Sequence, residues 1–117
     1  AYPDRLGVPF GAIDWATVGA LEFEPPDFES FPCLTLAFRA GRAGGAAPAW
    51  LNGANEVAVA AFLAGTIRWV DIHRVIEAAL DECHAPVPST VADVLDADRA
   101  GRDLARAEVE RRARALR

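Results

Sequence analysis

The stretch that decides the fold is PAWLNGANEVAVAAFLAG, residues 48–65. Nearly every residue in it is small or apolar, which predicts a buried helix, and Gly65 is placed to close that helix because glycine adopts a positive φ at little cost. Three polar residues stand within this apolar segment, namely Asn52, Asn55 and Glu56. Their role is the first question that the sequence raises.

Two interpretations of these three residues compete. On a helix, positions 55 and 56 lie three and four residues after position 52, so the three side chains share one face. A carboxylate beside two amides suits a hard cation, but one carboxylate is few for a tight metal site, and acid–base catalysis needs a second titratable partner. Alternatively, they hydrogen-bond the main chain of a crossing segment, whose buried N–H and C=O groups need partners. We therefore predict that Asn52, Asn55 and Glu56 form a structural polar cluster, and we assign no catalytic, cofactor-binding or metal-ligating residue.

Further helices are expected on both sides of this segment. Pro32 suits the first position of a helix, which Gly41 and the Gly44-Gly45 pair bring to a stop. Apolar residues at three- and four-residue spacing predict another helix over about 71–83, with Asp71 in its electropositive first turn.

The C-terminal third predicts two more helices. Ser89-Thr90 offers an N-terminal cap, and the apolar residues that follow indicate a short helix over 89–95 and a long one over 97–115. Short connections between all these helices favour a bundle of antiparallel neighbours.

The N-terminal stretch does not follow this pattern. Its one strand-like run is residues 20–24, ALEFE, in which apolar and charged residues alternate. A lone short strand needs a sheet or a helical surface to lie on, so we interpret the stretch as a linker arm that buries Trp15, Leu21 and Phe23 against a neighbour. The predicted fold class is therefore mainly α, with a linker arm that carries one short strand over 1–30 and a small C-terminal helical bundle over 31–117.

Composition sets limits on the function. The chain has 117 residues, which suits one domain, and it lacks an apolar run of the ~18 residues that a membrane span needs. Seventeen acidic and twelve basic residues give a net charge of −5, which argues against nucleic acid as a partner. The arginines between Arg99 and Arg117 alternate with acidic residues, as on a solvated helix face. We expect a soluble, cytoplasmic protein with neither a nucleic-acid nor a membrane partner.

The remaining reactive residues give no sign of catalysis. Cys33 and Cys83 lack the spacing of a zinc site and indicate a reduced, cytosolic chain. His73 is expected at the surface or at the edge of its helix, and His84 at a helix end where an imidazolium favours the dipole. There is no phosphate-binding glycine motif.

The tryptophans are interpreted as packing residues. Trp50 and Trp69 are expected to anchor the core or its edge, and Trp15 to fix the arm. The sequence also contains no Met, at position 1 or elsewhere. This indicates a processed chain or a piece of a longer protein.

A series of short motifs runs in register along nearly the whole chain. They are Tyr2-Pro3-x-Arg5, Asp14-Trp15, Leu21-x-Phe23 followed by Pro26-Asp27, Phe31-Pro32-Cys33-Leu34, the run from Leu51-Asn52 to Phe62-Leu63, Ile67-Arg68 with Asp71-Ile72, and Val91-x-Asp93-Val94-Leu95. Together they closely resemble the C-terminal part of the 1-deoxy-D-xylulose 5-phosphate reductoisomerase family. Gly53 departs from the alanine usual in that family, which should cost up to about 1 kcal/mol of helix stability.

The resemblance implies an NADPH-dependent oxidoreductase of the non-mevalonate pathway of isoprenoid biosynthesis, which makes 2-C-methyl-D-erythritol 4-phosphate with a divalent metal such as Mg²⁺ or Mn²⁺. In that family a dinucleotide-binding domain and a catalytic domain precede a linker and a C-terminal helical domain. The resemblance therefore implies that this chain is the C-terminal domain, that it holds no cofactor itself and is inactive alone. Its partners would be the upstream catalytic and NADPH-binding domains of the same polypeptide, in an intact enzyme that we expect to be a homodimer.

Two other functions stay open from the residues. One is a stand-alone helical protein-interaction module that grips a partner with the exposed arm and the helix over 99–117. The other is a metalloprotein that uses Glu56.

Overall fold

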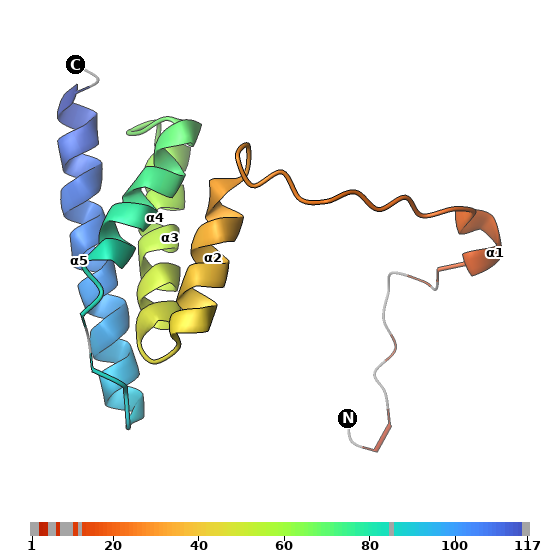
Figure 1. Cartoon of the computed structure of the whole chain (residues 1–117), viewed down its shortest axis with the longest axis horizontal. Coiled ribbons are helices and arrows are strands. Elements are labelled where there is room, and N and C mark those ends of the chain that lie inside the picture. Colours follow the sequence, from red (N-terminus) through yellow and green to blue (C-terminus); the bar gives the residue numbers. More distant parts are fainter. Residues whose placement is uncertain (1–2, 5–6, 8–10, 12, 85, 116–117) are drawn as a thin grey trace.

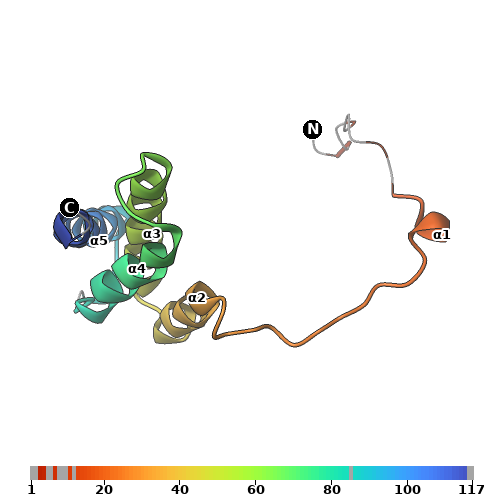
Figure 2. The same ribbon diagram turned by 90° about the horizontal axis from the view of Figure 1, so that it is seen from above.

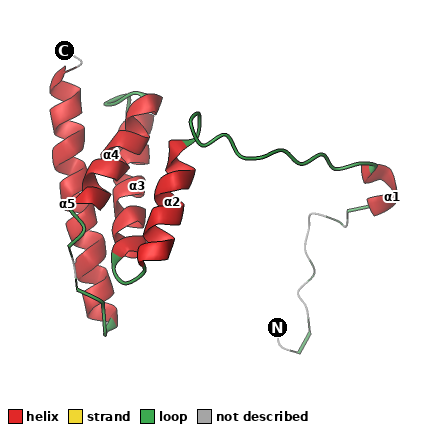
Figure 3. Cartoon of the chain, in the orientation of Figure 1, coloured by secondary structure: helices red, strands yellow, loops and turns green. Residues whose placement is uncertain are grey.

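The structure, a computed structural model, describes residues 3–4, 7, 11, 13–84 and 86–115. Its elements, shown in Figures 1 and 3, are the helices α1 (Trp15–Val18), α2 (Pro32–Ala43), α3 (Ala47–Leu63), α4 (Ile72–Asp81) and α5 (Val91–Ala115), with a 3₁₀ turn η1 (Trp69–Asp71) before α4. Tyr2 and Arg5 of the first motif, and Arg117 of the arginine-rich end, lie outside the described residues. Searched over its described residues, the chain has no helix both long and apolar enough to span a membrane.

Helices α2 to α5 form the predicted bundle. Helix α3 lies at its centre: it packs most extensively on α5, then on α4, and also contacts α2. Successive helices run in alternating directions, and the two views place α5 on the side of the bundle away from the arm (Figures 1 and 2). The central position of α3 explains its composition, because Ala54 and Ala58 are fully buried.

The end of α3 confirms the role expected of Gly65. Its φ is +70°, and its N–H donates to the Phe62 carbonyl at 2.8 Å. The next N–H, of Thr66, donates to the Ala61 carbonyl at 2.9 Å, which completes a Schellman motif. The chain can therefore reverse sharply here and enter η1.

Trp50 is a core residue, as predicted. It is 7% exposed, and its indole Nε1 donates a hydrogen bond of 2.7 Å to the main-chain oxygen of Ala79 in α4. This bond joins the central helix to its neighbour. Trp69, in contrast, lies at the edge: it is 67% exposed, with its ring edge-on to Phe62.

We expect Trp50→Phe to lower the free energy of unfolding by about 1–3 kcal/mol, because the Ala79 carbonyl is left buried without its donor. The measurement is urea unfolding followed by circular dichroism. Trp15→Phe is the matched control, since Trp15 is 71% exposed in the arm. Equal destabilisation by the two changes would contradict the assignment of Trp50.

The contact between α3 and α5 requires glycine on both helices. A Cβ at Gly53 would lie 2.7 Å from the Asp98 main-chain oxygen, and a Cβ at Gly101 would lie 2.6 Å from the Trp50 main-chain oxygen. Both distances are too short for packed atoms. From the sequence, Gly53 appears only as a small loss of helix stability. In the structure it also has a packing role, because the absence of a Cβ lets α3 and α5 approach each other.

The C-terminal third is one helix, and the two separate helices predicted for it are wrong. The expected cap is confirmed: Thr90 Oγ1 accepts from the N–H of Asp93 at 3.2 Å, and the Asp93 carboxylate accepts from the N–H of Thr90 at 2.9 Å. Beyond it, α5 continues through the position where a break was expected. Ion pairs such as Asp98–Arg102, with the acid four residues before the base, stabilise a continuous helix.

The predicted strand over 20–24 is also wrong. No strand occurs in the described ranges, and these residues are extended without a pairing neighbour. Leu21 is 61% and Phe23 is 88% exposed. A strand forms only when its main-chain N–H and C=O groups pair with a second strand. Figure 1 shows this part of the arm running away from the bundle.

Near the bundle the arm does make contacts. The ring of Phe28 packs at a tilt against Phe38 of α2, with the ring centroids 6.3 Å apart. The guanidinium of Arg42 lies 5.5 Å from the centroid of the same Phe38 ring. These contacts hold the last residues of the arm on α2.

Candidate docking site

A groove of about 560 Å³ is lined by the start of α2, where the arm joins the bundle, and by residues of α3, η1 and α4. We call it the arm-end groove. Its walls come from the start of α2 and the residues before it, from α3, and from η1 with the start of α4. The lining residues are Glu29, Ser30, Phe31, Pro32, Cys33, Asn55, Val59, Trp69, Val70, Ile72 and His73.

The residues that lead into α2 have a fixed conformation. The Asp27 carboxylate accepts hydrogen bonds of 3.0 Å from the main-chain N–H groups of Glu29 and Ser30. Hydrogen bonding with Ser30, first through its side chain and then through its main chain, lowers the pKa of Asp27, and the main-chain bond from Glu29 adds a smaller effect in the same direction. We call residues 27–31 the arm root, and it forms one rim of the groove.

The groove is largely apolar and partly open to solvent. Phe31, Trp69 and Val70 are 62%, 67% and 48% exposed. Exposed apolar side chains that gather around one depression are typical of a surface that another molecule covers.

A few polar side chains also reach the groove. Asn55 and His73 are half-buried there. Burial raises the pKa of the Cys33 thiol, which therefore stays protonated at neutral pH. The sequence predicts His73 at the surface or at the edge of its helix; the structure has it half-buried in the lining of the groove, to which Asn55 also contributes.

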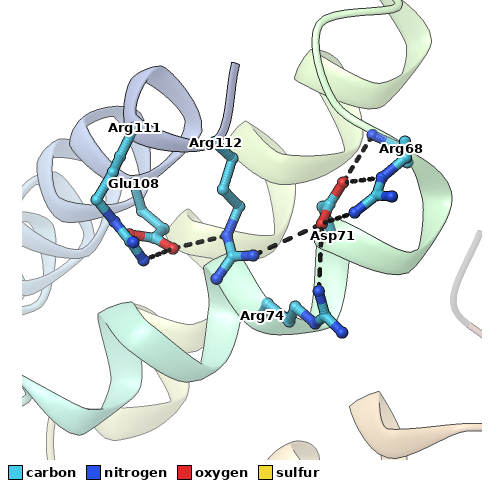
Figure 4. A network of polar contacts seen from close by, with 6 residues as sticks. All are labelled: Arg68, Asp71, Arg74, Glu108, Arg111 and Arg112. Carbon is cyan, nitrogen blue, oxygen red and sulfur yellow. Dashed lines mark hydrogen bonds and ion pairs between the residues drawn. The ribbon is translucent and has the colours of Figure 1, made fainter. Parts of the chain in front are cut away.

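The turn that carries Trp69 and Val70 is held by Asp71 (Figure 4). The Asp71 side chain is 2% exposed and pairs with Arg68. Its Oδ2 accepts from the main-chain N–H of Arg68 at 3.2 Å and from Arg68 Nε at 2.9 Å, and its Oδ1 accepts from Arg68 Nη2 at 3.1 Å. The sequence predicts that Asp71 lies in the first turn of a helix and interacts with its N-terminus. In the structure its carboxylate instead points back to Arg68.

These bonds determine the ionisation of Asp71. The Arg68 hydrogen bonds lower the pKa of Asp71 to about 2, although burial opposes the shift. The Asp71 carboxylate accepts from the main-chain N–H three residues earlier, as in one half of a capping box, but the Arg68 side chain can only donate. The sequence therefore carries no capping-box signature that would identify this pair.

The same carboxylate connects η1 to the C-terminal end of α5 (Figure 4). Arg112 Nη1 lies 3.5 Å from Asp71 Oδ1, and Arg112 Nε lies 2.6 Å from Glu108 Oε1, although its N–H is out of line for a hydrogen bond. Burial raises the pKa of Glu108, but the hydrogen bond from Arg111 and the charge of Arg112 lower it overall. Sequence reasoning missed Arg112 because its partner lies far away in the chain.

Asn52, Asn55 and Glu56, the three polar residues predicted to form one cluster, do not all lie together. Asn52 Nδ2 donates to Glu56 Oε1 at 3.1 Å, and Arg102 Nη2 of α5 donates to Glu56 Oε2 at 2.6 Å. The hydrogen bonds from Arg102 and then Asn52 lower the pKa of Glu56. Asn55 instead lines the arm-end groove. Among the residues that the structure describes, the hydrogen-bond partners of Glu56 are thus side chains, and the expected main-chain partner from a crossing segment is not among them.

The described residues contain no set of three or more His, Cys, Asp or Glu side chains arranged to hold a metal ion. A Mg²⁺ ion therefore does not fit the residues that the structure describes in this chain. His84, predicted at a helix end, lies three residues beyond the end of α4 and is exposed.

Comparisons with known proteins agree with one another. The family described as DXP reductoisomerase C-terminal domain matches residues 1–104. Over 107 residues the chain is 50% identical to the 1-deoxy-D-xylulose 5-phosphate reductoisomerase of Cupriavidus pinatubonensis. The matched stretch is 92% of this chain and 27% of the relative. Over 105 residues it is 45% identical to that of Solibacter usitatus, with 90% and 26% covered.

Solved structures give the same result. The fold is similar to that of 1-deoxy-D-xylulose 5-phosphate reductoisomerase from Zymomonas mobilis in complex with NADPH, with a TM-score of 0.81, 42% identity and coverage of 94% of this chain and 29% of that one. It is also similar to a DOX-P reductoisomerase in complex with NADPH, fosmidomycin and magnesium, with a TM-score of 0.77, 34% identity and coverage of 94% and 29%. The chain spans less than a third of the length of these proteins.

Proposed function

Because the chain belongs to the 1-deoxy-D-xylulose 5-phosphate reductoisomerase family, whose C-terminal domain it matches over residues 1–104, we propose that it is the C-terminal structural domain of such an enzyme. By itself it catalyses no turnover. The family match carries the proposal. The exposed apolar arm supports it, because Trp15, Leu21 and Phe23 need a neighbouring body to cover them.

The chemistry of the intact enzyme follows from the family. It rearranges and reduces 1-deoxy-D-xylulose 5-phosphate to 2-C-methyl-D-erythritol 4-phosphate, with NADPH as reductant and Mg²⁺ or Mn²⁺ as the metal. The residues described in this chain offer no metal-ligating set, so the groups that hold these cofactors belong to the catalytic and NADPH-binding domains of the same polypeptide. We place the intact enzyme in the cytoplasm as a homodimer, with no nucleic-acid or membrane partner.

Within the chain we propose two parts with different tasks. The arm over 1–30 lies on the catalytic domain, and the bundle over 31–117 supports that domain from one side. Asn52 and Glu56 have a structural role in the bundle, supported by the Arg102–Glu56 ion pair of 2.6 Å between α5 and α3. Asn55 acts at the bundle surface.

The chain alone, mixed with NADPH, Mn²⁺ and 1-deoxy-D-xylulose 5-phosphate, is expected to oxidise no NADPH above the blank. The C. pinatubonensis enzyme without its matched 107 residues should lose activity by about a hundredfold or more, because misplaced catalytic groups cost about that much. A chimera that carries this chain in place of those residues should recover it. NADPH absorbance measures all three reactions.

The same experiment separates the rival function. If the shortened enzyme stays fully active, or if this chain alone turns over substrate, the proposal is wrong. If the shortened enzyme is inactive and the chimera recovers nothing, the stand-alone interaction module becomes the better explanation of the exposed arm.

A further inference from the structure

We propose that the arm-end groove seats a main-chain segment of the polypeptide that precedes this chain in the intact enzyme. An apolar side chain of that segment enters beside Trp69, and the Asn55 amide bonds to its main chain. The inference rests on the proposed function and adds the contact surface and the chemistry of the partner.

The first argument is the exposure of the groove walls. Phe31, which precedes α2, and Trp69 of η1 both line the groove and leave 62% and 67% of their surface in water. Burial of such rings contributes strongly to binding, and tryptophan is enriched among the residues that dominate interfaces. An apolar side chain between them would remove both rings from solvent.

The second argument is that the groove is built before any partner binds. The Asp71–Arg68 bonds hold the turn that carries Trp69 and Val70 (Figure 4), and the Asp27 bonds hold the opposite rim. A fixed surface loses little conformational entropy on association. The groove is thus suited to receive a partner without rearrangement.

Asn55 indicates what kind of segment binds. Leu51, Ala58 and Val59, which lie one helical turn from it, are small or apolar, yet its half-buried amide reaches the groove. A side-chain amide offers a donor and an acceptor together, which matches the C=O and N–H of a main-chain segment. A partner that presents only apolar side chains would leave this amide without hydrogen bonds.

The occupant is placed by the chain's own connectivity. The relatives are more than three times as long as the matched part, which covers 27% of the C. pinatubonensis enzyme. The arm root that rims the groove is the point where the bundle joins the arm. A body that covers Trp15, Leu21 and Phe23 is therefore tethered to the groove by a short segment of chain, which raises its effective concentration there.

The test uses Cys33, which lines the groove, as the probe. Alkylation by iodoacetamide is followed by peptide mass spectrometry in the chain alone and in the chimera with the C. pinatubonensis enzyme. We expect Cys33 to react about tenfold more slowly in the chimera, because a covered thiol reacts only in molecules whose interface is open. Cys83, at the end of α4, is the internal reference and should change little.

A matched pair of variants tests the apolar contact. Val70→Lys puts a charge into the groove, and Val94→Lys puts one on α5, at side chains that are 48% and 40% exposed. In the chimera, Val70→Lys should restore the reactivity of Cys33 and lower kcat, whereas Val94→Lys should do neither. Because both side chains are exposed, both variants of the free chain should melt close to the parent.

Each outcome decides between the two proposals. An active chimera in which Cys33 reacts as fast as in the chain alone overturns the inference and leaves the proposed function standing. An inactive chimera overturns the proposed function, and the inference that rests on it falls as well. Protection of Cys33 in the chain alone that rises with concentration would show that a second copy fills the groove, and would also overturn the inference.

Discussion

Asp71→Asn is expected to lower the free energy of unfolding by about 3 kcal/mol, as is typical when one partner of a buried ion pair is removed. The Asp71 side chain is 2% exposed and faces Arg68, Arg74 and Arg112. Asparagine cannot balance these charges, and it loses the paired bonds to the Arg68 guanidinium. Urea unfolding followed by circular dichroism measures the change.

Asp103→Asn is the matched control. Asp103 also pairs with an arginine, Arg106, at 2.6 Å, but its side chain is 74% exposed. Water screens such a pair, so the control should unfold close to the parent. If Asp71→Asn also unfolds like the parent, the buried network is not a source of stability.

The same residue should shape the stability of the chain in acid. The pKa of Asp71 is about 2 in the folded chain, below its ordinary value of 3.8, so the unfolded state binds the proton first as the pH falls. The contribution of about 2 kcal/mol is therefore complete above about pH 4 and is lost between about pH 4 and pH 2. Other carboxylates titrate in this range, including Asp93, whose pKa is also about 2. The informative measurement is thus the difference between the parent and Asp71→Asn, which should shrink over this interval.

Gly101→Ala is expected to destabilise the bundle by about 2 kcal/mol, because overpacking costs about 1–3 kcal/mol. The new Cβ would lie 2.6 Å from the main-chain oxygen of Trp50 and 3.0 Å from its Cα. Main-chain atoms cannot swing aside, so α3 and α5 would have to separate. Thermal unfolding at several urea concentrations gives the free-energy difference.

Gly41→Ala controls for the helix propensity of the added methyl group. Gly41 also lies inside a helix, but a Cβ there would meet no atom within 4 Å. This variant should gain up to about 1 kcal/mol from better helix propensity. Opposite signs at the two positions would identify the close helix contact as the cause, and a stabilising Gly101→Ala would refute it.

Much of the fold follows from local patterns in the sequence. The helix that begins at Pro32 and the buried central helix appear where they are predicted, and Gly65 and Thr90 act as helix stop and cap. These features depend on residues within one or two turns of each other, so a sequence displays them directly. The break predicted near residue 96 failed because ion pairs along α5 outweigh the weak local signal.

The candidate site was much less visible. The sequence shows that Asn55 is a polar residue within an apolar helix. It does not show that Asn55 and Glu56 contact different parts of the bundle, because this depends on the helices that pack on each face of α3. Glu56 meets Arg102, 46 positions along the chain, and Asn55 meets the groove. Such contacts depend on how the helices pack, and a helical wheel does not contain that information.

By itself, the sequence determined that this protein is a helical bundle with a preceding arm and that it belongs to a reductoisomerase family, since both follow from local composition and ordered motifs. Only the tertiary structure decided which polar groups pair, why glycine stands at positions 53 and 101, and where the arm root, η1 and α3 meet to form a groove. These features arise between helices distant in the chain, where packing distance and burial set the energy.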